Sequence, residues 1–199
     1  ANITGKRKVP ELGDSAIKTG DDVNIRVVAV NGAVFGGKKV NVLKADGKVR
    51  DKSSLSIALF VSWGDFQFYT GGDLTGHSPV DVEAPVANAI GDVDVAKSNH
   101  HGSKTANNPF FLAKLKPEVV LISAGIGEAN ARYHLPNDQV MKRFSEASFF
   151  HQVFQTSKGE GRAPASSLTK VVNADGDVLI VAEPNKYTVN GREFQTDGH

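Results

Sequence analysis

The sequence contains no cysteine among its 199 residues, which excludes disulfide bonds, thiolate metal sites and a cysteine nucleophile. Any metal site must therefore be built from histidine, aspartate, glutamate or water. The chain has six histidines, and they are the first candidates for such a site: His77, His100, His101, His134, His151 and His199.

Long apolar runs are absent as well. No stretch approaches the roughly 20 apolar residues that a membrane-spanning helix needs, so we expect a soluble chain without a membrane span. Neither sign of charge dominates, because 23 Lys and Arg against 22 Asp and Glu give a net charge of +1. Nucleic-acid-binding domains are usually more basic, so the charge does not support nucleic acid as a partner, although it does not exclude it. A cysteine-free chain fits reducing and oxidising compartments alike, so the location stays open.

Composition divides the chain into two parts. Residues 1–22 are polar and predict an arm, or a connection to a segment upstream; residues 23–199 predict a single α/β domain. Alternating or continuous apolar residues indicate strands at 23–30, 39–43, 54–61, 66–70, 92–96, 119–125 and 150–156, followed by a β-meander at 168–189. Helices are predicted at 110–116 and 136–147, whereas residues 80–90 fit a short helix or a loop equally well.

One segment imitates a phosphate-binding loop. The run from Gly32 to Lys39 nearly matches GxxxxGK[ST], but Lys39 replaces the hydroxyl residue that would hold magnesium. A strand rather than a helix is predicted to follow, so no helix N-terminus would face a phosphate. We therefore do not expect a nucleotide site there.

Two predicted strands end in groups that could hold a metal. Asp73 ends the run TGGD directly after the strand at 66–70, and His100 and His101 follow the strand at 92–96. Sites in open α/β sheets collect at strand ends, because loops there present side chains from a rigid edge. A carboxylate and a histidine on adjacent strand ends suit zinc or a similar divalent ion.

Three segments together resemble a known family. The run TGGD, the run DVDVAKSNHHGSKTANNPFFLAKLKPEVVLISAG and the run NARYHLP are similar to the second half of the metallo-β-lactamase fold, in its ComEC-type hydrolase branch. The resemblance covers roughly residues 23–183. It implies half of an αββα sandwich, with a mixed β-sheet and helices on one side.

The resemblance also implies roles for individual residues. Asp73 would be the carboxylate that bridges two metal ions, and His100 would ligate the second ion. His101 would lie beside the metal or contact substrate, and His134 would face the substrate. In DKSSLSI, Ser54 matches the family's Asn-x-x-Ser strand start, although Asp51 stands where Asn is usual.

Three departures from the family pattern affect this interpretation. Gly72 is either inserted into the usual TGD or shifts it by one residue, and Leu135 stands where a histidine would directly precede proline. The upstream His-x-His-x-Asp-His ligand motif is absent from these 199 residues. Either an upstream half is missing or the protein is a degenerate relative, so we expect this chain alone to be inactive.

The leading hypothesis is a fragment of a metal-dependent hydrolase, in which two zinc-like ions activate a hydroxide that attacks a phosphodiester or another ester. A second hypothesis keeps the metals but assigns a small ester, lactone or amide as substrate. A third is a non-catalytic binding module of the same fold. The ComEC-type branch includes exported members, which favours export without settling it.

Overall fold

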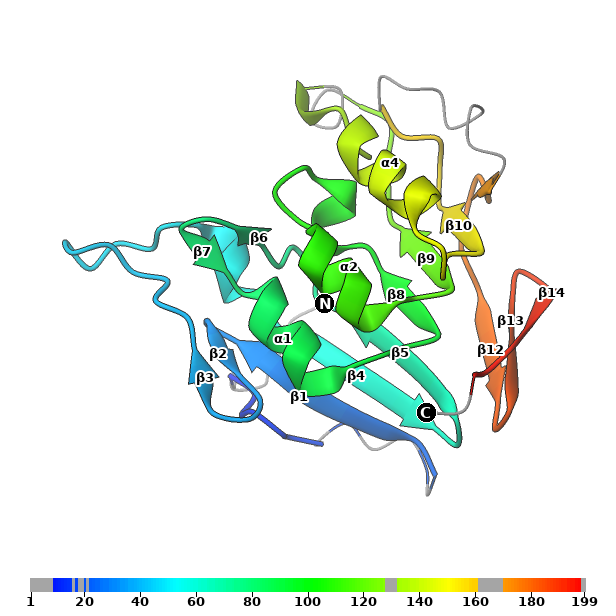
Figure 1. Cartoon of the computed structure of the whole chain (residues 1–199), viewed down its shortest axis with the longest axis horizontal. Helices are drawn as coiled ribbons and strands as arrows, with labels where there is room; N and C mark the ends of the chain where they lie inside the picture. Colours follow the sequence, from blue (N-terminus) through cyan, green and yellow to red (C-terminus); the bar gives the residue numbers. More distant parts are fainter. Residues whose placement is uncertain are drawn as a thin grey trace, which may run out of the picture.

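A computed structural model describes residues 9–15, 17, 20, 22–127, 132–160 and 170–197 (Figure 1). Its centre is a nine-stranded sheet in the spatial order β11-β10-β9-β8-β5-β4-β1-β2-β3. The strands along the chain are β1 (Asn24–Val30), β2 (Ala33–Val34), β3 (Lys38–Lys39), β4 (Ala58–Trp63), β5 (Phe66–Thr70), β8 (Val95–Lys97), β9 (Val119–Ile122), β10 (Gln152–Gln155) and β11 (Val171–Asn173).

The sheet is mixed, as predicted. Neighbouring strands are parallel in the half of the sheet that runs from β5 through β8, β9 and β10 to β11. They are antiparallel in the other half, which runs from β5 through β4, β1 and β2 to β3. The sequence predicts turns at Asn31-Gly32 and at Gly64-Asp65, and both are confirmed: Asn31 and Gly32 join β1 to β2, and Gly64 lies between the paired strands β4 and β5. Asn31 and Gly32 both have positive φ, which matches the twist of a tight hairpin.

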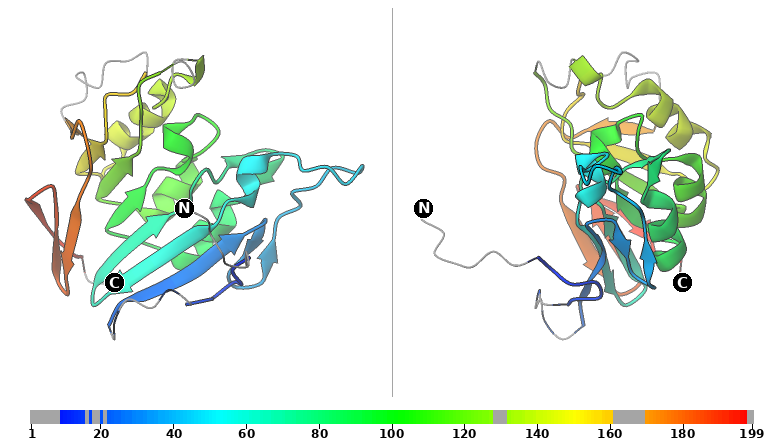
Figure 2. Two further views of the ribbon diagram at one scale, coloured as in Figure 1. Left: turned by 180° about the vertical axis from the view of Figure 1, so that it is seen from behind. Right: turned by 90° about the vertical axis from the view of Figure 1, so that its left-hand side faces the viewer.

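Three helices of the described chain cover one face of the sheet, which confirms the predicted arrangement (Figures 1 and 2). They are α1 (Glu83–Ile90), α2 (Pro109–Leu115) and α4 (Asp138–Glu146). Residues 80–90, which the sequence left open, thus include a helix. The predicted starts are close: Asn108 caps α2 by accepting from Phe111 N–H, and Asn137 caps α4, which begins two residues after Pro136.

The opposite face of the sheet carries a second, smaller sheet. It is formed by β12 (Ile180–Glu183), β13 (Lys186–Val189) and β14 (Arg192–Gln195), in the order β12-β13-β14. Tyr187 and Val189 pack there on Val95, Val119 and other apolar residues of the large sheet. The predicted meander is therefore partly wrong, because β11 leaves it to pair with β10; residues 168–169 lie outside the described part.

A second correction concerns the strand predicted at 39–43. Only β3 pairs in the sheet, and Leu43 makes a single isolated bridge with Val49. The reason is local packing: Val42 turns inward against Gly32, where an added Cβ would lie 2.5 Å from a Val42 methyl carbon. Outside the two larger sheets, β6 (Gly76–His77) and β7 (Val80–Asp81) form a small pair of their own.

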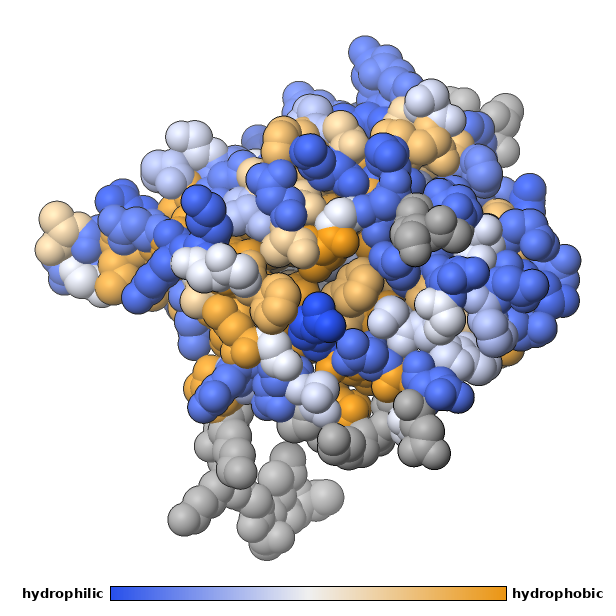
Figure 3. Space-filling view, turned by 60° about the horizontal axis from the view of Figure 1, so that its bottom comes forward, coloured by the Kyte–Doolittle hydropathy of each residue, from blue (hydrophilic) through white to orange (hydrophobic). Residues whose placement is uncertain are grey.

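The described part of the N-terminal arm lies against β1, where Gly13 N–H donates to Val27 O at 2.9 Å and Val27 N–H donates to Asp14 O at 3.1 Å. The face seen in Figure 3 is mixed, with hydrophilic side chains prevailing and apolar ones showing in separate patches. Among the described helices, none combines the length and the apolar character needed to cross a membrane.

Candidate metal centre

The topology brings the two predicted strand ends together. Strands β5 and β8 are parallel neighbours, and Thr70 at the end of β5 pairs in register with Lys97 at the end of β8. Their following loops therefore leave the sheet at the same edge. The loops also contact each other directly, because His100 N–H donates to Gly72 O at 3.0 Å.

Asp73 and His101 face each other across this edge. Asp73 Oδ1 lies 3.3 Å from His101 Nε2, and Asp73 N–H donates to Ser56 Oγ at 3.2 Å. The other ring nitrogen, His101 Nδ1, lies 2.7 Å from Ser123 O, at the end of β9. A carbonyl oxygen only accepts, so Nδ1 carries a proton and Nε2 is directed at the carboxylate.

The loop that carries the histidines has a constrained backbone. It forms the 3₁₀ turn η2 (Asn99–Gly102), in which His100 and His101 both have left-handed φ values of 48° and 54°. His134, in the other predicted motif, also has a positive φ of 51°. This region is sparsely populated by residues other than glycine, and such residues cluster at functional sites.

Gly102 joins the two histidine motifs. Its φ is +76°, and a Cβ added there would lie 2.8 Å from Pro136 Cβ. Asn137 N–H also donates to Gly102 O at 2.8 Å. The loop after β8 is thus held directly against the segment that contains His134, which is itself half-buried.

A cavity of about 490 Å³ opens beside His100. His100 Nδ1 is buried and has no hydrogen-bond partner in the described part of the chain. His134 is not among the lining residues, but both of its neighbours are. The cavity is lined by Asp51, His77, His100, Ser103, Lys104, Thr105, Tyr133 and Leu135.

Two of these lining residues bear on the sequence analysis. Asp51 caps the 3₁₀ turn η1 (Lys52–Leu55), and Ser54 Oγ donates to Asp51 O at 2.5 Å, so the loosely matched serine supports the cavity wall. The sequence around His77, LTGHSPV, is typical of an exposed loop, yet His77 is half-buried in the wall, with Nδ1 2.6 Å from Thr75 Oγ1. No motif pointed to His77. His151, by contrast, is exposed just before β10.

A buried carboxyl group, which the sequence did not reveal, holds the loop that follows β8. Glu83, at the start of α1, has no exposed surface, and its oxygens accept from Asn107 N–H at 2.6 Å, Asn99 Nδ2 at 2.8 Å and Asn108 N–H at 2.9 Å. Burial raises the pKa of Glu83 to about 7, against the opposing effect of these donors. Gly76 makes room for it, because a Cβ there would lie 1.9 Å from Glu83 Oε2.

One cation lies close to Asp73. Burial lowers the pKa of Lys97, while the negative charge of Asp73 acts in the opposite direction. Lys97 Nζ donates to Ser98 O at 3.2 Å, and the side chain lines a second cavity with Ser123. A positive group is thus placed next to the carboxylate from the sheet face opposite the helices.

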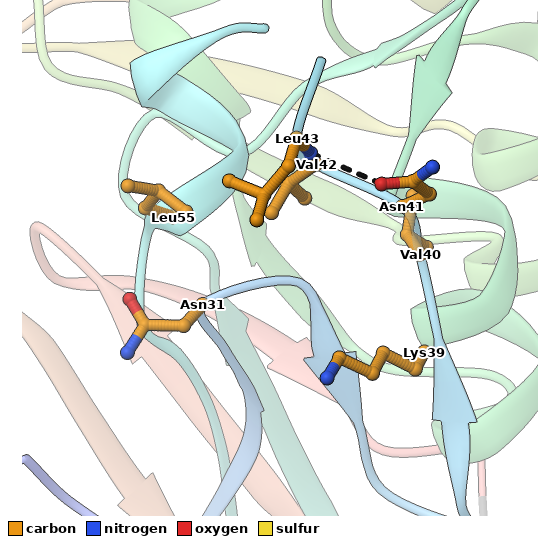
Figure 4. A pocket seen from close by; sticks show the side chains of 7 residues that line it. All are labelled: Asn31, Lys39, Val40, Asn41, Val42, Leu43 and Leu55. Carbon is orange, nitrogen blue, oxygen red and sulfur yellow. Dashed lines mark hydrogen bonds between the residues drawn. The ribbon is translucent and has the colours of Figure 1, made fainter. Parts of the chain in front are cut away.

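The segment that imitates a phosphate loop forms no such site. Strand β3 follows its glycines, as expected, and an adjoining cavity of about 530 Å³ is lined mainly by apolar side chains (Figure 4). In this view the only hydrogen bond drawn between the labelled residues is Leu43 N–H to Asn41 Oδ1, at 3.2 Å. None of the residues that line this cavity lies at the N-terminus of a helix.

Fold and site together define a mixed-sheet α/β protein with a carboxylate–imidazole pair at a strand edge. No protein-family model matches the chain. A segment of 70 residues, 35% of the chain, is 34% identical to Recombination protein 2 of Haemophilus influenzae. The chain covers 8% of the length of that protein, so the similarity concerns a small part of it.

Proposed function

We propose that this chain supplies part of the centre of a metal-dependent hydrolase that cleaves phosphodiesters, and that Asp73 and His101 are ligands of one divalent ion. The observation that carries the proposal is the geometry of this pair. With Nδ1 donating to Ser123 O, a neutral His101 points the lone pair of Nε2 at a carboxylate oxygen 3.3 Å away. Two acceptors facing each other need a proton or a cation between them.

A tetrahedral zinc ion fits this spacing. Zinc–ligand bonds of about 2.0–2.2 Å place two ligand atoms about 3.3–3.6 Å apart. Histidines that bind metals almost always donate their other ring N–H to a carbonyl or carboxylate, as His101 does to Ser123 O. The sequence favoured His100 as the ligand; the geometry favours His101, and His100, with its unpartnered Nδ1, remains our candidate for a second ion.

When bound, the ions would lower the pKa of a shared water toward ~7 and neutralise negative charge on the leaving oxygen. The chain's own residues position the reaction. The Ser56 hydroxyl holds the backbone of Asp73, Ser123 O orients the ring of His101, and the cavity beside His100 offers a place for substrate. Lys104, exposed at its wall, would attract a phosphate. His134 would face the substrate from the adjoining segment.

The resemblance to the ComEC-type branch and the similarity to a protein named for recombination both favour a phosphodiester of nucleic acid over a small ester. The two substrate classes differ in their response to salt. Contacts with a phosphate backbone weaken steeply as the salt concentration rises, whereas turnover of a small neutral ester does not. A full set of ligands would also need residues from outside this chain, and we propose an upstream segment as their source.

The metal pair can be tested by titrating Mn²⁺, which is paramagnetic, into isotope-labelled chain and recording the histidine ring signals by NMR. We expect the ring of His101 to broaden first, well before the exposed ring of His151. In Asp73→Asn the broadening of His101 should need at least about ten times more Mn²⁺, because loss of even an outer partner of a ligand costs about 10–100-fold in affinity. The His151→Asn variant is the matched control and should behave as wild type.

Equal broadening of all exposed histidines would contradict the metal pair. The hydrolase assignment has a separate test, in a longer protein that joins this chain to an upstream metal-binding half. There, Asp73→Asn should abolish cleavage of bis(p-nitrophenyl) phosphate. Unchanged cleavage would favour the non-catalytic binding module instead.

A further inference from the structure

A second group of carboxylates lies at the other end of the same strands. Asp94 directly precedes β8 and Glu118 directly precedes β9, whereas the histidines and Ser123 follow these two parallel strands. Asp197, two residues beyond β14, joins them from the C-terminal segment. The group is therefore separated from Asp73 and His101 by the length of strands β8 and β9.

The three side chains are close enough to share one ion. One carboxylate oxygen from each of Asp94, Glu118 and Asp197 lies within 4.8 Å of the other two. Asp94 is buried, Glu118 is half-buried and Asp197 is exposed, so the group reaches from the protein interior to solvent. The backbone helps to hold it, because Gln67 N–H donates to Asp94 Oδ2 at 2.6 Å.

A buried hydroxyl group provides an independent indication of a ligand. Tyr187, on β13, has no exposed surface, and its hydroxyl oxygen has no hydrogen-bond partner in the described part of the chain. The charges of Glu118, Asp94 and Asp197 all act on this hydroxyl, so it lies in the neighbourhood of the group. Glu118 Oε2 is likewise buried without a hydrogen-bond partner among the described residues. Buried polar atoms of this kind normally have a partner, often a water or an ion.

We infer that Asp94, Glu118 and Asp197 form a binding site for a calcium ion, with the Tyr187 hydroxyl facing the ion or one of its waters. The ligand set is oxygen only, which suits a hard cation and not zinc. Calcium–oxygen bonds of about 2.3–2.6 Å allow ligand oxygens up to about 4.6–5.2 Å apart, whereas the shorter bonds of magnesium allow only about 4.2 Å. The three oxygens all lie within 4.8 Å of one another, inside the calcium range. Calcium also accepts the irregular geometry of three carboxylates more readily than magnesium, which demands a near-ideal octahedron.

Charge supports the same conclusion. Three carboxyl groups gathered at one point repel one another when they are charged. Lys116 also lies near, but its ammonium is engaged by Asp92 at 2.8 Å. A divalent ion would offset the repulsion and would tie the C-terminal segment to the starts of β8 and β9.

The test is thermal unfolding of the purified chain with and without CaCl₂, together with calorimetric titration of calcium. We expect one calcium per chain and a rise in Tm of about 3–5 °C at a calcium concentration ten times the Kd. Magnesium should produce a smaller rise. Asp197→Asn, which changes an exposed side chain, should weaken calcium binding at least about tenfold, as loss of a charged ligand does.

Glu193→Gln is the matched control, because it removes one exposed carboxylate from the adjoining strand β14, where Glu193 pairs with Lys186. Its calcium response should equal that of wild type. The inference is overturned if wild type shows no calcium-dependent rise in Tm. It is equally overturned if Asp197→Asn and Glu118→Gln both respond as wild type does; the acids would then only share a proton. Neither result bears on the metal pair at Asp73 and His101.

Discussion

Replacing Glu83 by glutamine should remove a large part of the pH dependence of stability. The wild-type carboxyl group is fully buried, and burial raises its pKa from 4.5 to about 7. Between pH 4.5 and about pH 7 the folded protein therefore holds a proton on Glu83 that the unfolded chain releases. Stability should fall as the pH rises through this window and stay lower above it. A shift of this size corresponds to about 3 kcal/mol.

The substitution keeps the shape of the side chain and removes its charge. Glutamine can still accept from two of the three donors at Asn99, Asn107 and Asn108, but its amide NH₂ would face the third, at a cost of about 1–3 kcal/mol. A protonated Glu83 has the same conflict, so the variant should nearly match wild type at low pH. At about pH 8 it should equal or exceed the stability of wild type, because it buries no charge.

The assay is urea unfolding of both proteins at several pH values between about 4.5 and 8, followed by subtraction of the two unfolding free energies. Subtraction cancels the other titrating groups, so the difference should change by about 3 kcal/mol across the range. Parallel pH profiles for the two proteins would refute the reasoning, since Glu83 would then titrate alike in the folded and unfolded chains.

Two further predictions concern neighbours of the site. Gly76→Ala should destabilise the chain by about 1–3 kcal/mol in urea unfolding, because the added carbon meets the Glu83 carboxylate; an unchanged midpoint would show that the carboxylate moves at no cost. Asp73→Asn should lower the pKa of Lys97 further, because Asp73 opposes the effect of burial on that amine. NMR titration of the lysine side chain measures this, and an unchanged pKa would contradict the contact.

Much of the fold was predictable because its signals are local. Asn31-Gly32 and the cap at Asn108 depend on a few adjacent residues, and both predictions are confirmed. The apolar run at 119–125 indicated a strand, and β9 lies within the sheet between β8 and β10. Helix α1 was harder, because its N-cap position is Val82, which offers no side-chain hydrogen bond.

The candidate site was predictable only in part. The sequence placed Asp73 and the two histidines on neighbouring strand ends, but it favoured His100, whereas His101 is the imidazole that meets the carboxylate. That choice depends on Ser123 O, a backbone atom at the end of another strand. The role of Glu83 could not be predicted for a similar reason. Glutamate is usually exposed, and its burial here depends on three hydrogen-bond donors from residues 99–108.

The way Glu83 holds the loop has a consequence for how this protein could diversify. Two of its three bonds are to backbone N–H groups, at Asn107 and Asn108, and such groups are present whatever side chain a residue carries. Ser103, Lys104 and Thr105 line the cavity between this anchor and the histidines. Their side chains could therefore drift or be redesigned for new ligands while the loop keeps its attachment, so the fold separates the control of selectivity from the control of shape.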